Sequence, residues 1–113
     1  MEVKSCSKSG LAIRDALDIV GGKWKLPILH VLTAEGPMRF KELQRSLEGI
    51  TARMLSKELK ELELNRMVTR DVFDTAPVTV IYTVTQHGMS LCPVIEALHN
   101  WGTEHRKKIF EYD

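Results

Sequence analysis

Residues 40–64 constrain the fold of this 113-residue chain more than any other segment. Its first apolar residues recur at intervals of three and four positions, as on one face of a helix: Phe40, Leu43 and Leu47. Gly49 can adopt the left-handed conformation that ends a helix, and Thr51 is a favourable N-cap for a second helix. The segment therefore predicts two short helices joined by a tight turn, with the second helix over residues 51–64.

The second predicted helix has one apolar face and one cationic face. Its leucines recur at helical spacing: Leu55, Leu59 and Leu62. At about 100° per residue, Arg53, Lys57 and Lys60 fall on roughly the opposite side. A helix that packs by its leucines and presents cations fits the major groove of duplex DNA. The same pattern is also typical of a helix face that is only solvated.

The segment after this helix predicts a β-hairpin. Asn65 and Arg66 are expected to end the helix, with Asn65 as the residue that tolerates positive φ. Residues 67–73 and 78–84 are rich in Val, Ile, Tyr and Thr, as strands are, and residues 74–77 connect them. Helix, turn, helix and hairpin follow one another in the order of a winged helix-turn-helix. The predicted fold class is therefore α+β, mainly α with a small antiparallel β-hairpin.

Apolar periodicity also predicts helices at both ends of the chain. Two stripes flank the glycine pair at positions 21 and 22: Ile13, Ala16, Leu17 and Val20 before it, and Trp24, Ile28, Val31 and Leu32 after it. Thr85 is expected to cap a long C-terminal helix, whose apolar stripe is too broad for a small domain to bury alone. We therefore expect a two-fold homodimer through the first and last helices. The expected interface residues are Ile13, Leu17, Leu91, Ile95, Leu98, Trp101 and Ile109.

Length and charge limit the organisation of the chain. We expect one winged-helix domain over residues 11–113, preceded by a flexible tail over residues 1–10. The overall net charge is only +1. Residues 38–70 contain eight basic and five acidic residues, a net charge of +3, whereas residues 71–113 have a net charge of −3. This polarity suits a protein with a DNA-binding side and an opposite side that does not bind DNA.

Several motifs in order resemble those of the HxlR-type regulators, bacterial relatives of the MarR winged-helix group. Residues 16–24, ALDIVGGKW, are similar to the opening of that family, and residues 36–43, GPMRFKEL, are similar to its G-P-x-R-F-x-E-L. Residues 50–63 and 80–88 resemble its recognition helix and its second wing strand. The resemblance runs from about Leu11 to Trp101. It implies a dimeric transcription regulator that binds DNA and responds to a small-molecule or electrophile signal.

The winged-helix interpretation assigns candidate DNA contacts to the second helix, to the helix before it and to the wing over residues 67–84. The candidates are Arg39, Lys41, Thr51, Ala52, Arg53, Ser56, Lys57, Lys60, Arg70, Thr75 and Thr79. Arg53 is the candidate for base readout, because a guanidinium can bond O6 and N7 of guanine together. Lys57 and Lys60 are expected to contact phosphate. Many relatives carry a basic residue near position 79, where this chain has Thr79, so a strong wing-to-phosphate contact is not expected.

Symmetry then predicts the form of the DNA site. Two recognition helices about 34 Å apart face successive major grooves on one side of the duplex. The operator is therefore expected to be an imperfect inverted repeat.

The two cysteines are expected to be thiols rather than a disulfide. Several members of the family sense oxidants through a cysteine just before the first helix, but the family's spacing from Trp24 reaches Leu11 here. Cys6 lies further out, between Lys4 and Lys8, which lower a thiol's pKa. Cys6 is thus either a redox sensor or an incidental thiol.

Metal binding and catalysis are the remaining chemical alternatives. Cys92, Glu96 and His99 share one face of the last predicted helix and are metal-ligand types, but a single Cys and His at such spacing usually bind nothing. No phosphate-binding glycine loop, H-E-x-x-H motif or nucleophile elbow occurs in the sequence. We therefore expect no metal, no cofactor and no enzyme activity. The main alternative function is a winged-helix protein-interaction module without DNA binding.

The location of the protein follows from hydropathy. No apolar run approaches the roughly 20 residues of a membrane helix. The first four residues, MEVK, lack the apolar region of a secretory signal. We therefore expect a soluble cytoplasmic protein with no membrane partner.

Overall fold

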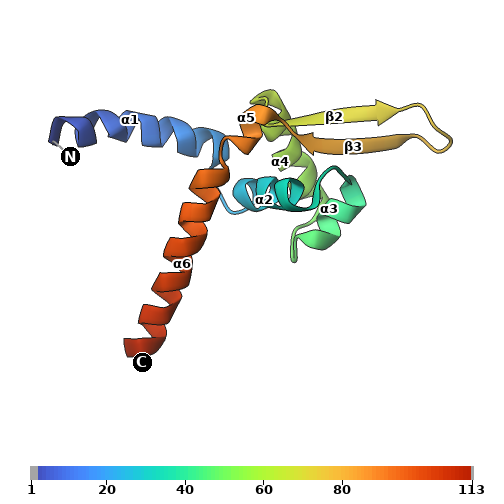
Figure 1. Cartoon of the computed structure of the whole chain (residues 1–113). Coiled ribbons are helices and arrows are strands. Elements are labelled where there is room, and N and C mark those ends of the chain that lie inside the picture. Colours follow the sequence, from blue (N-terminus) through green and yellow to red (C-terminus); the bar gives the residue numbers. More distant parts are fainter. Residues whose placement is uncertain (1–2, 113) are drawn as a thin grey trace.

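The computed structural model describes residues 3–112, with side chains for residues 10–111. Its elements are α1 (Val3–Val20), α2 (Lys25–Glu35), β1 (Met38–Arg39), α3 (Phe40–Ser46), α4 (Ala52–Leu64), β2 (Val68–Phe73), β3 (Thr79–Val84), α5 (Gln86–Met89) and α6 (Cys92–Tyr112). Helices α2, α3 and α4 and the base of the sheet form the central body, from which α1, α6 and the far end of the β2–β3 hairpin extend (Figure 1). This is the predicted winged helix-turn-helix architecture.

The strands form one antiparallel sheet in the order β1-β3-β2. Strands β2 and β3 are the wing, in which Val68 pairs with Val84 and Phe73 with Thr79. Strand β1 adds Met38 opposite Tyr82. The sequence did not predict β1, because a strand of two residues is too short to show an alternating pattern.

The core lies where α2, α3 and α4 meet the sheet. The fully buried side chains are Ile28, Leu29, Leu32, Leu43, Leu55, Leu59, Leu62 and Val68. They include all three leucines predicted for the apolar face of residues 51–64. Because the leucine face of α4 packs against the core, the opposite face of this helix points outward.

Three local predictions are corrected by the structure. Helix α1 begins at Val3, so residues 3–10 are helical rather than a tail; neither Pro nor Gly occurs between Val3 and Gly10 to stop it. The positive φ lies at Arg66, not Asn65, because Asn65 Nδ2 donates to the Glu61 carbonyl at 3.0 Å and the chain turns one residue later.

The third correction concerns Thr85, which caps the short helix α5 rather than the long C-terminal helix. Its hydroxyl accepts a hydrogen bond from Gly88 N at 2.9 Å. Helix α6 begins only at Cys92, after a separate turn. The cap motif was correctly identified, but sequence periodicity did not reveal that the helix restarts.

Helices α1 and α6 project from the body (Figure 1), and several apolar side chains on both helices are exposed. On α1, Ile13 and Leu17 are 58% and 59% exposed, and on α6 Trp101 is 67% exposed. Leu91 and Ile95, also predicted at the dimer interface, are instead partly buried against the chain's own core. None of the described helices is long and apolar enough to cross a membrane.

Candidate nucleic-acid interface

The turn between α3 and α4 sets the position of α4. Gly49 has φ 90°, as its predicted role in ending a helix requires, and Ile50 is buried in the core. Thr51 is the N-cap of α4, and its hydroxyl accepts a hydrogen bond from Met54 N at 3.1 Å. The hydroxyl of Thr51, a predicted DNA contact, therefore also holds the start of the helix.

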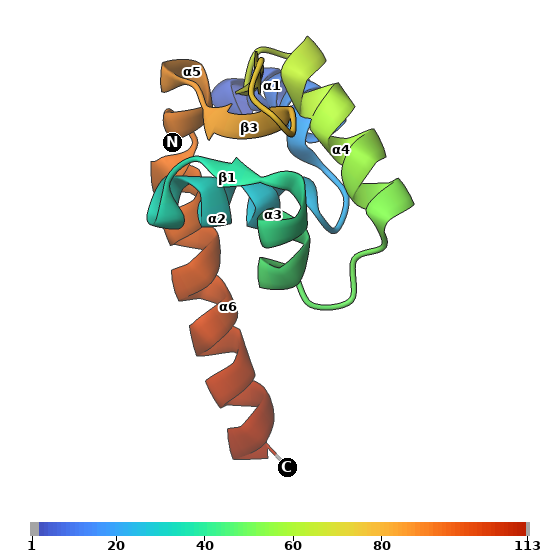
Figure 2. The same cartoon turned by 90° about the vertical axis from the view of Figure 1, so that its right-hand side faces the viewer.

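The side of α4 remote from its leucines is free and cationic. Arg53, Lys57 and Lys60 are exposed, and so is Ala52, whereas Ser56 is half-buried. Among the described side chains, Arg53 and Lys60 form no ion pair, and Lys57 Nζ is 4.0 Å from Glu58 Oε1. Helix α4 lies along an outer edge of the body, and α6 points away from it (Figure 2). No described part of the chain covers these cations.

Two carboxylates of α4 are held on its inner side by Lys25 of α2. Lys25 Nζ lies 2.8 Å from Glu58 Oε2 and 2.6 Å from Glu61 Oε2. Burial by itself lowers the pKa of Lys25, but the hydrogen bonds to Glu58 and Glu61 and the charges of these two carboxylates together raise the pKa above its ordinary value. The hydrogen bond and the charge of Lys25 lower the pKa of Glu61. The ion pairs thus neutralise acidic groups that would otherwise oppose the cations of α4.

Sequence reasoning missed Lys25, because a lysine beside Lys23 looks like any surface cation. The available signal was Glu58, which lies between Leu55 and Leu62 on the leucine side of the helix. A carboxylate that is only 7% exposed requires a partner. That requirement predicts a buried cation opposite Glu58.

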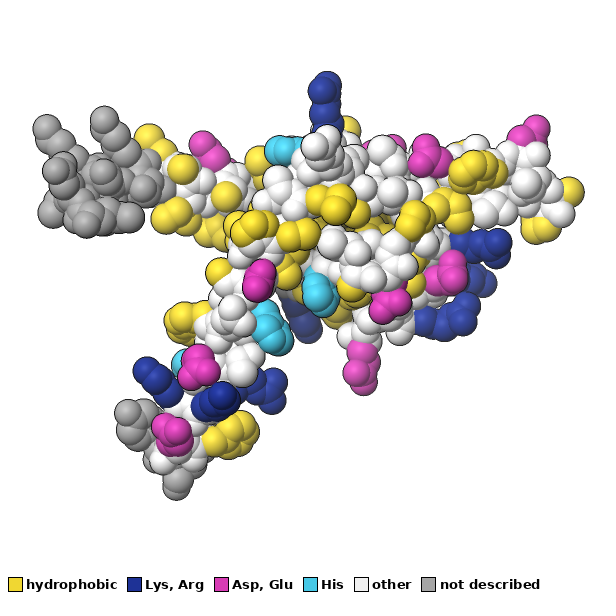
Figure 3. Space-filling view, in the orientation of Figure 1, with side chains coloured by type: hydrophobic (Ala, Val, Ile, Leu, Met, Phe, Trp, Pro, Cys, Tyr) yellow, Lys and Arg dark blue, Asp and Glu magenta, His cyan; other side chains and the backbone are white. Residues whose placement is uncertain are grey.

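Helix α3 adds cations beside the wing. Arg39 and Lys41, both predicted as candidates, are exposed, and Arg39 N donates to Glu42 Oε1 at 3.0 Å, which caps the helix. Arg45, which was not among the predicted contacts, is also exposed and lines the same hollow as Arg39 and Lys41, next to Thr79 of the wing. Cationic side chains gather on this side of the molecule, below the wing (Figure 3).

The wing presents few cations. Arg70 is exposed near its base, but Asp71 and Asp74 follow it. The hydroxyls of Thr75 and Thr79 lie 3.1 Å apart, and Thr75 donates to the Pro77 carbonyl at 2.6 Å. These two threonines therefore close the hairpin, and their contact with DNA stays a prediction.

The geometry gives little support to the hypotheses of a redox-active cysteine and of a metal site. Cys6 falls within α1, but its side chain lies outside the described residues. Cys92, Glu96 and His99 line one hollow between α2 and α6. Within the described residues, however, no group of three His, Cys, Asp or Glu side chains is placed to hold a metal ion.

Comparison with known proteins gives consistent matches across most of the chain. The model of the HxlR-like helix-turn-helix family matches residues 19–110. The putative regulatory protein MalR of Fusobacterium mortiferum is 38% identical over 104 residues, which cover 92% of this chain and 98% of that protein.

Solved structures agree in fold and sequence. The redox regulator HypR in its reduced form superposes with a TM-score of 0.81 at 35% identity, covering 89% of this chain and 99% of that one. The reduced form of the transcriptional regulator YodB from Bacillus subtilis has a TM-score of 0.71 at 40% identity, covering 80% and 87%.

Proposed function

This chain belongs to the HxlR-like helix-turn-helix family of transcriptional regulators, and we propose that it binds specific duplex DNA through the outer face of α4. The observation that supports this most directly is the exposure of Arg53, Lys57 and Lys60 opposite a fully buried leucine stripe. A helix held in this way can enter a major groove without disturbing the core.

The cations divide by position into base and phosphate contacts. Arg53 lies in the first turn of α4, the part of a recognition helix that approaches base edges. Lys57 and Lys60 lie one and two turns further along, where the groove wall brings phosphates close. Arg39, Lys41 and Arg45 extend the phosphate contacts to α3. Ala52 and Ser56 are small enough to let the helix approach the bases, where a thymine methyl is an apolar partner.

A homodimer completes the proposed site. The exposed apolar side chains of α1 and α6, among them Leu17, Leu98 and Trp101, provide a surface that a second copy would cover. Two α4 helices related by a two-fold axis call for an inverted-repeat operator with half-sites about one helical turn apart.

Titration with mixed-sequence duplex DNA at low and high salt tests the proposal. A cationic helix face releases counterions, so affinity should fall steeply as salt rises. A chain that serves only as a protein-interaction module would show no such binding at either salt concentration. A fragment selection from genomic DNA then identifies the operator, and an inverted repeat in the selected fragments supports the dimer.

We further propose that oxidation of Cys6 changes DNA affinity. Among the related structures is the redox regulator HypR in its oxidized form, at 35% identity. Cys6 occupies a position two helical turns before Ile13, on the helix that we assign to the dimer interface. Diamide treatment should alter DNA binding of the wild type and of Cys92→Ser but not of Cys6→Ser. If diamide left the DNA affinity of the wild type unchanged, the proposal would be wrong.

A further inference from the structure

Lys57 of α4 lies close to two carboxylates of its own helix. Its ammonium is 4.0 Å from Glu58 Oε1. The pKa of Glu61 is lowered first by the hydrogen bond and charge of Lys25, and also by the charge of Lys57. Glu61 is four positions after Lys57, the spacing at which side chains of a helix can pair. Either carboxylate can therefore hold the Lys57 ammonium, and an ammonium that is held in this way is not available to a phosphate.

Lys25 of α2 competes with Lys57 for the same two carboxylates. The Lys25 ammonium lies 2.8 Å from Glu58 Oε2 and 2.6 Å from Glu61 Oε2. Hydrogen bonds between an ammonium and a carboxylate are about 2.7–2.9 Å long. Lys25 is therefore bonded to both carboxylates, whereas Lys57, at 4.0 Å from Glu58, is not bonded to it.

Burial decides this competition in favour of Lys25. The Lys25 and Glu58 side chains are 11% and 9% exposed, whereas that of Lys57 is 65% exposed. A buried charge without a partner is costly, but an exposed ammonium is hydrated and gains little from an ion pair. The favoured arrangement therefore gives both carboxylates to Lys25 and leaves Lys57 in solvent.

The charges of these four side chains cancel, and removing Lys25 would leave a net charge of −1. Lys57 would then be the one described cation within 4.0 Å of Glu58. A long exposed side chain such as Lys57 can close the remaining distance by changing its rotamer. Without Lys25, Lys57 would therefore be paired within its own helix.

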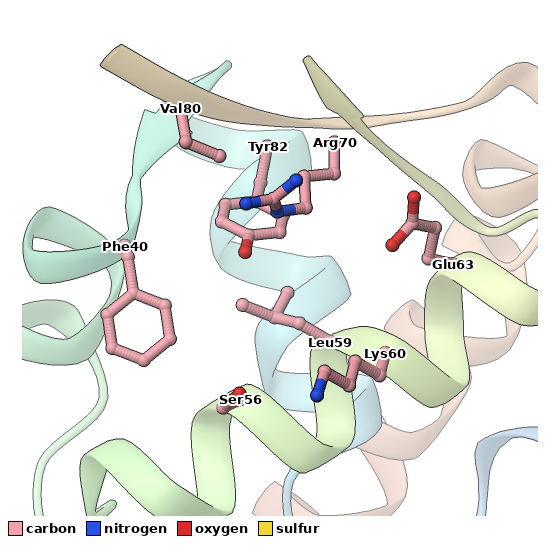
Figure 4. Close-up of a pocket in the computed structure, with 8 residues that line it drawn as sticks. All are labelled: Phe40, Ser56, Leu59, Lys60, Glu63, Arg70, Val80 and Tyr82. Atoms are coloured by element: carbon pink, nitrogen blue, oxygen red, sulfur yellow. The ribbon is translucent and has the colours of Figure 1, made fainter. Parts of the chain in front are cut away.

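Lys60, one turn after Lys57 on α4, is not part of this group. It lines a hollow between α4 and the wing, opposite Arg70 and Tyr82 of the wing strands (Figure 4). Lys60 forms no ion pair with the described residues. Its availability to phosphate should not depend on Lys25, which makes Lys60 a matched control on the same helix.

We infer that Lys25 is a positioning residue for DNA binding, which holds Glu58 and Glu61 and so keeps Lys57 free for phosphate. The inference rests on the proposed function, in which Lys57 contacts phosphate. Lys25 itself does not reach DNA, because it is buried on the inner side of α4. Its replacement should therefore act on DNA binding as though Lys57 were lost.

The salt dependence of DNA affinity tests this inference, because its slope counts phosphate contacts. With mixed-sequence duplex DNA, Lys57→Ala should lower the slope of log affinity against log salt by about 1 in the wild type. In Lys25→Met, where Lys57 is already held, the same change should lower the slope by less than about half as much. Lys60→Ala should lower it by about 1 in both backgrounds. An equal effect of Lys57→Ala in the two backgrounds would overturn the inference.

A triple variant separates this role from a purely structural one. Lys25→Met combined with Glu58→Gln and Glu61→Gln lacks the ion pairs but has neither of the two carboxylates that would hold Lys57. The effect of Lys57→Ala on the slope should return to about 1. If it stays small, loss of the ion pairs has displaced α4, and the inference is wrong.

The triple variant leaves no unpaired charge in the core, so it should fold even if Lys25→Met does not. In that case Lys25→Met with Glu58→Gln, which keeps the more exposed Glu61, replaces the single variant. Lys57→Ala should then lower the slope less in the double variant than in the triple variant. Equal effects in these two backgrounds would also overturn the inference.

Urea unfolding tests the same competition without DNA. Lys57→Ala should leave the urea midpoint of the wild type unchanged, because its exposed ammonium contributes little to stability. In Lys25→Met it should lower the midpoint, because Lys57 has become the partner of Glu58. The same change of midpoint in both backgrounds would contradict the inference. If the wild type binds no DNA at any salt concentration, the proposed function fails, while unfolding still decides which lysine can hold Glu58.

Discussion

The ammonium of Lys25 lies 2.8 Å from the carboxylate of Glu58, and this ion pair joins α2 to the inner side of α4. Only 11% and 9% of the two side chains are exposed, so the pair is screened little by solvent. A second carboxylate, that of Glu61, shares the same ammonium at 2.6 Å. The rotation of α4 about its axis, and hence the direction of its cationic face, depends partly on this contact.

Replacing Lys25 with methionine should destabilise the fold. The change leaves the Glu58 carboxylate buried with only the exposed Lys57 nearby, whose Nζ is 4.0 Å away, and breaking a buried pair in proteins costs about 3–5 kcal/mol. Urea unfolding followed by circular dichroism measures the loss. Lys107→Met is the matched control. Both side chains of the Lys107–Glu104 pair are exposed, so this pair should contribute nothing measurable to stability. Equal stability of Lys25→Met and wild type would show that Glu58 is solvated.

The stability difference between wild type and Lys25→Met should depend on pH in two steps. The pKa of Glu61 is lowered from 4.5, so its contribution is present above pH 4.5 and is lost as pH falls through the lowered value. The pKa of Lys25 is raised from 10.5, so its contribution is present below pH 10.5 and is lost as pH rises through the raised value. Urea unfolding should give a constant difference between these limits, and Glu61→Gln should reduce the acid step.

Sequence periodicity predicted the features of this fold that depend on a local sequence pattern. The Leu55, Leu59 and Leu62 stripe and the Thr51 cap lie where the pattern placed them, because a helix face and its first hydrogen bond are local properties. The Lys25–Glu58 pair joins positions 33 residues apart, and no local pattern encodes it. The same holds for the hollow between α4 and the wing, which exists only once Tyr82 and Lys60 are brought together.

Gly88 should not tolerate a methyl group, because α5 lies directly on the start of the wing. A Cβ at this position would be 2.3 Å from the Met67 carbonyl oxygen and 2.7 Å from Val84 Cγ2. The backbone would have to move, and Gly88→Ala should lower stability by about 1–3 kcal/mol. Thermal unfolding measures this, with Gly102→Ala as the control, since a Cβ there meets nothing within 4 Å. A smaller loss in Gly88→Ala than in Gly102→Ala would contradict the packing of α5.

A charge on the exposed face of α6 should dissociate the proposed dimer. Leu98 is 51% exposed in the single chain, so Leu98→Asp should leave the fold intact and act only on association. Sedimentation at micromolar concentration should show a dimer for the wild type and a monomer for the variant. Val72→Asp, equally exposed but on the wing, should remain dimeric. A wild type that sediments as a monomer would contradict the interface assignment.

Arg53 and Lys57 should differ in what they contribute to DNA binding, although both are exposed on α4. Arg53→Ala should cost about 1–3 kcal/mol on the selected operator and relax specificity at one base position, because it removes a bidentate guanine contact. Lys57→Ala should weaken all sequences alike and reduce the slope of log affinity against log salt by about 1, as loss of one phosphate contact does. Competition binding on an operator library at several salt concentrations separates the two effects. Lys108→Ala, at an exposed lysine of α6, should change neither. If Arg53→Ala instead lowered affinity uniformly across the library, its guanidinium would contact the backbone, and base readout would have to come from the small residues at the start of α4.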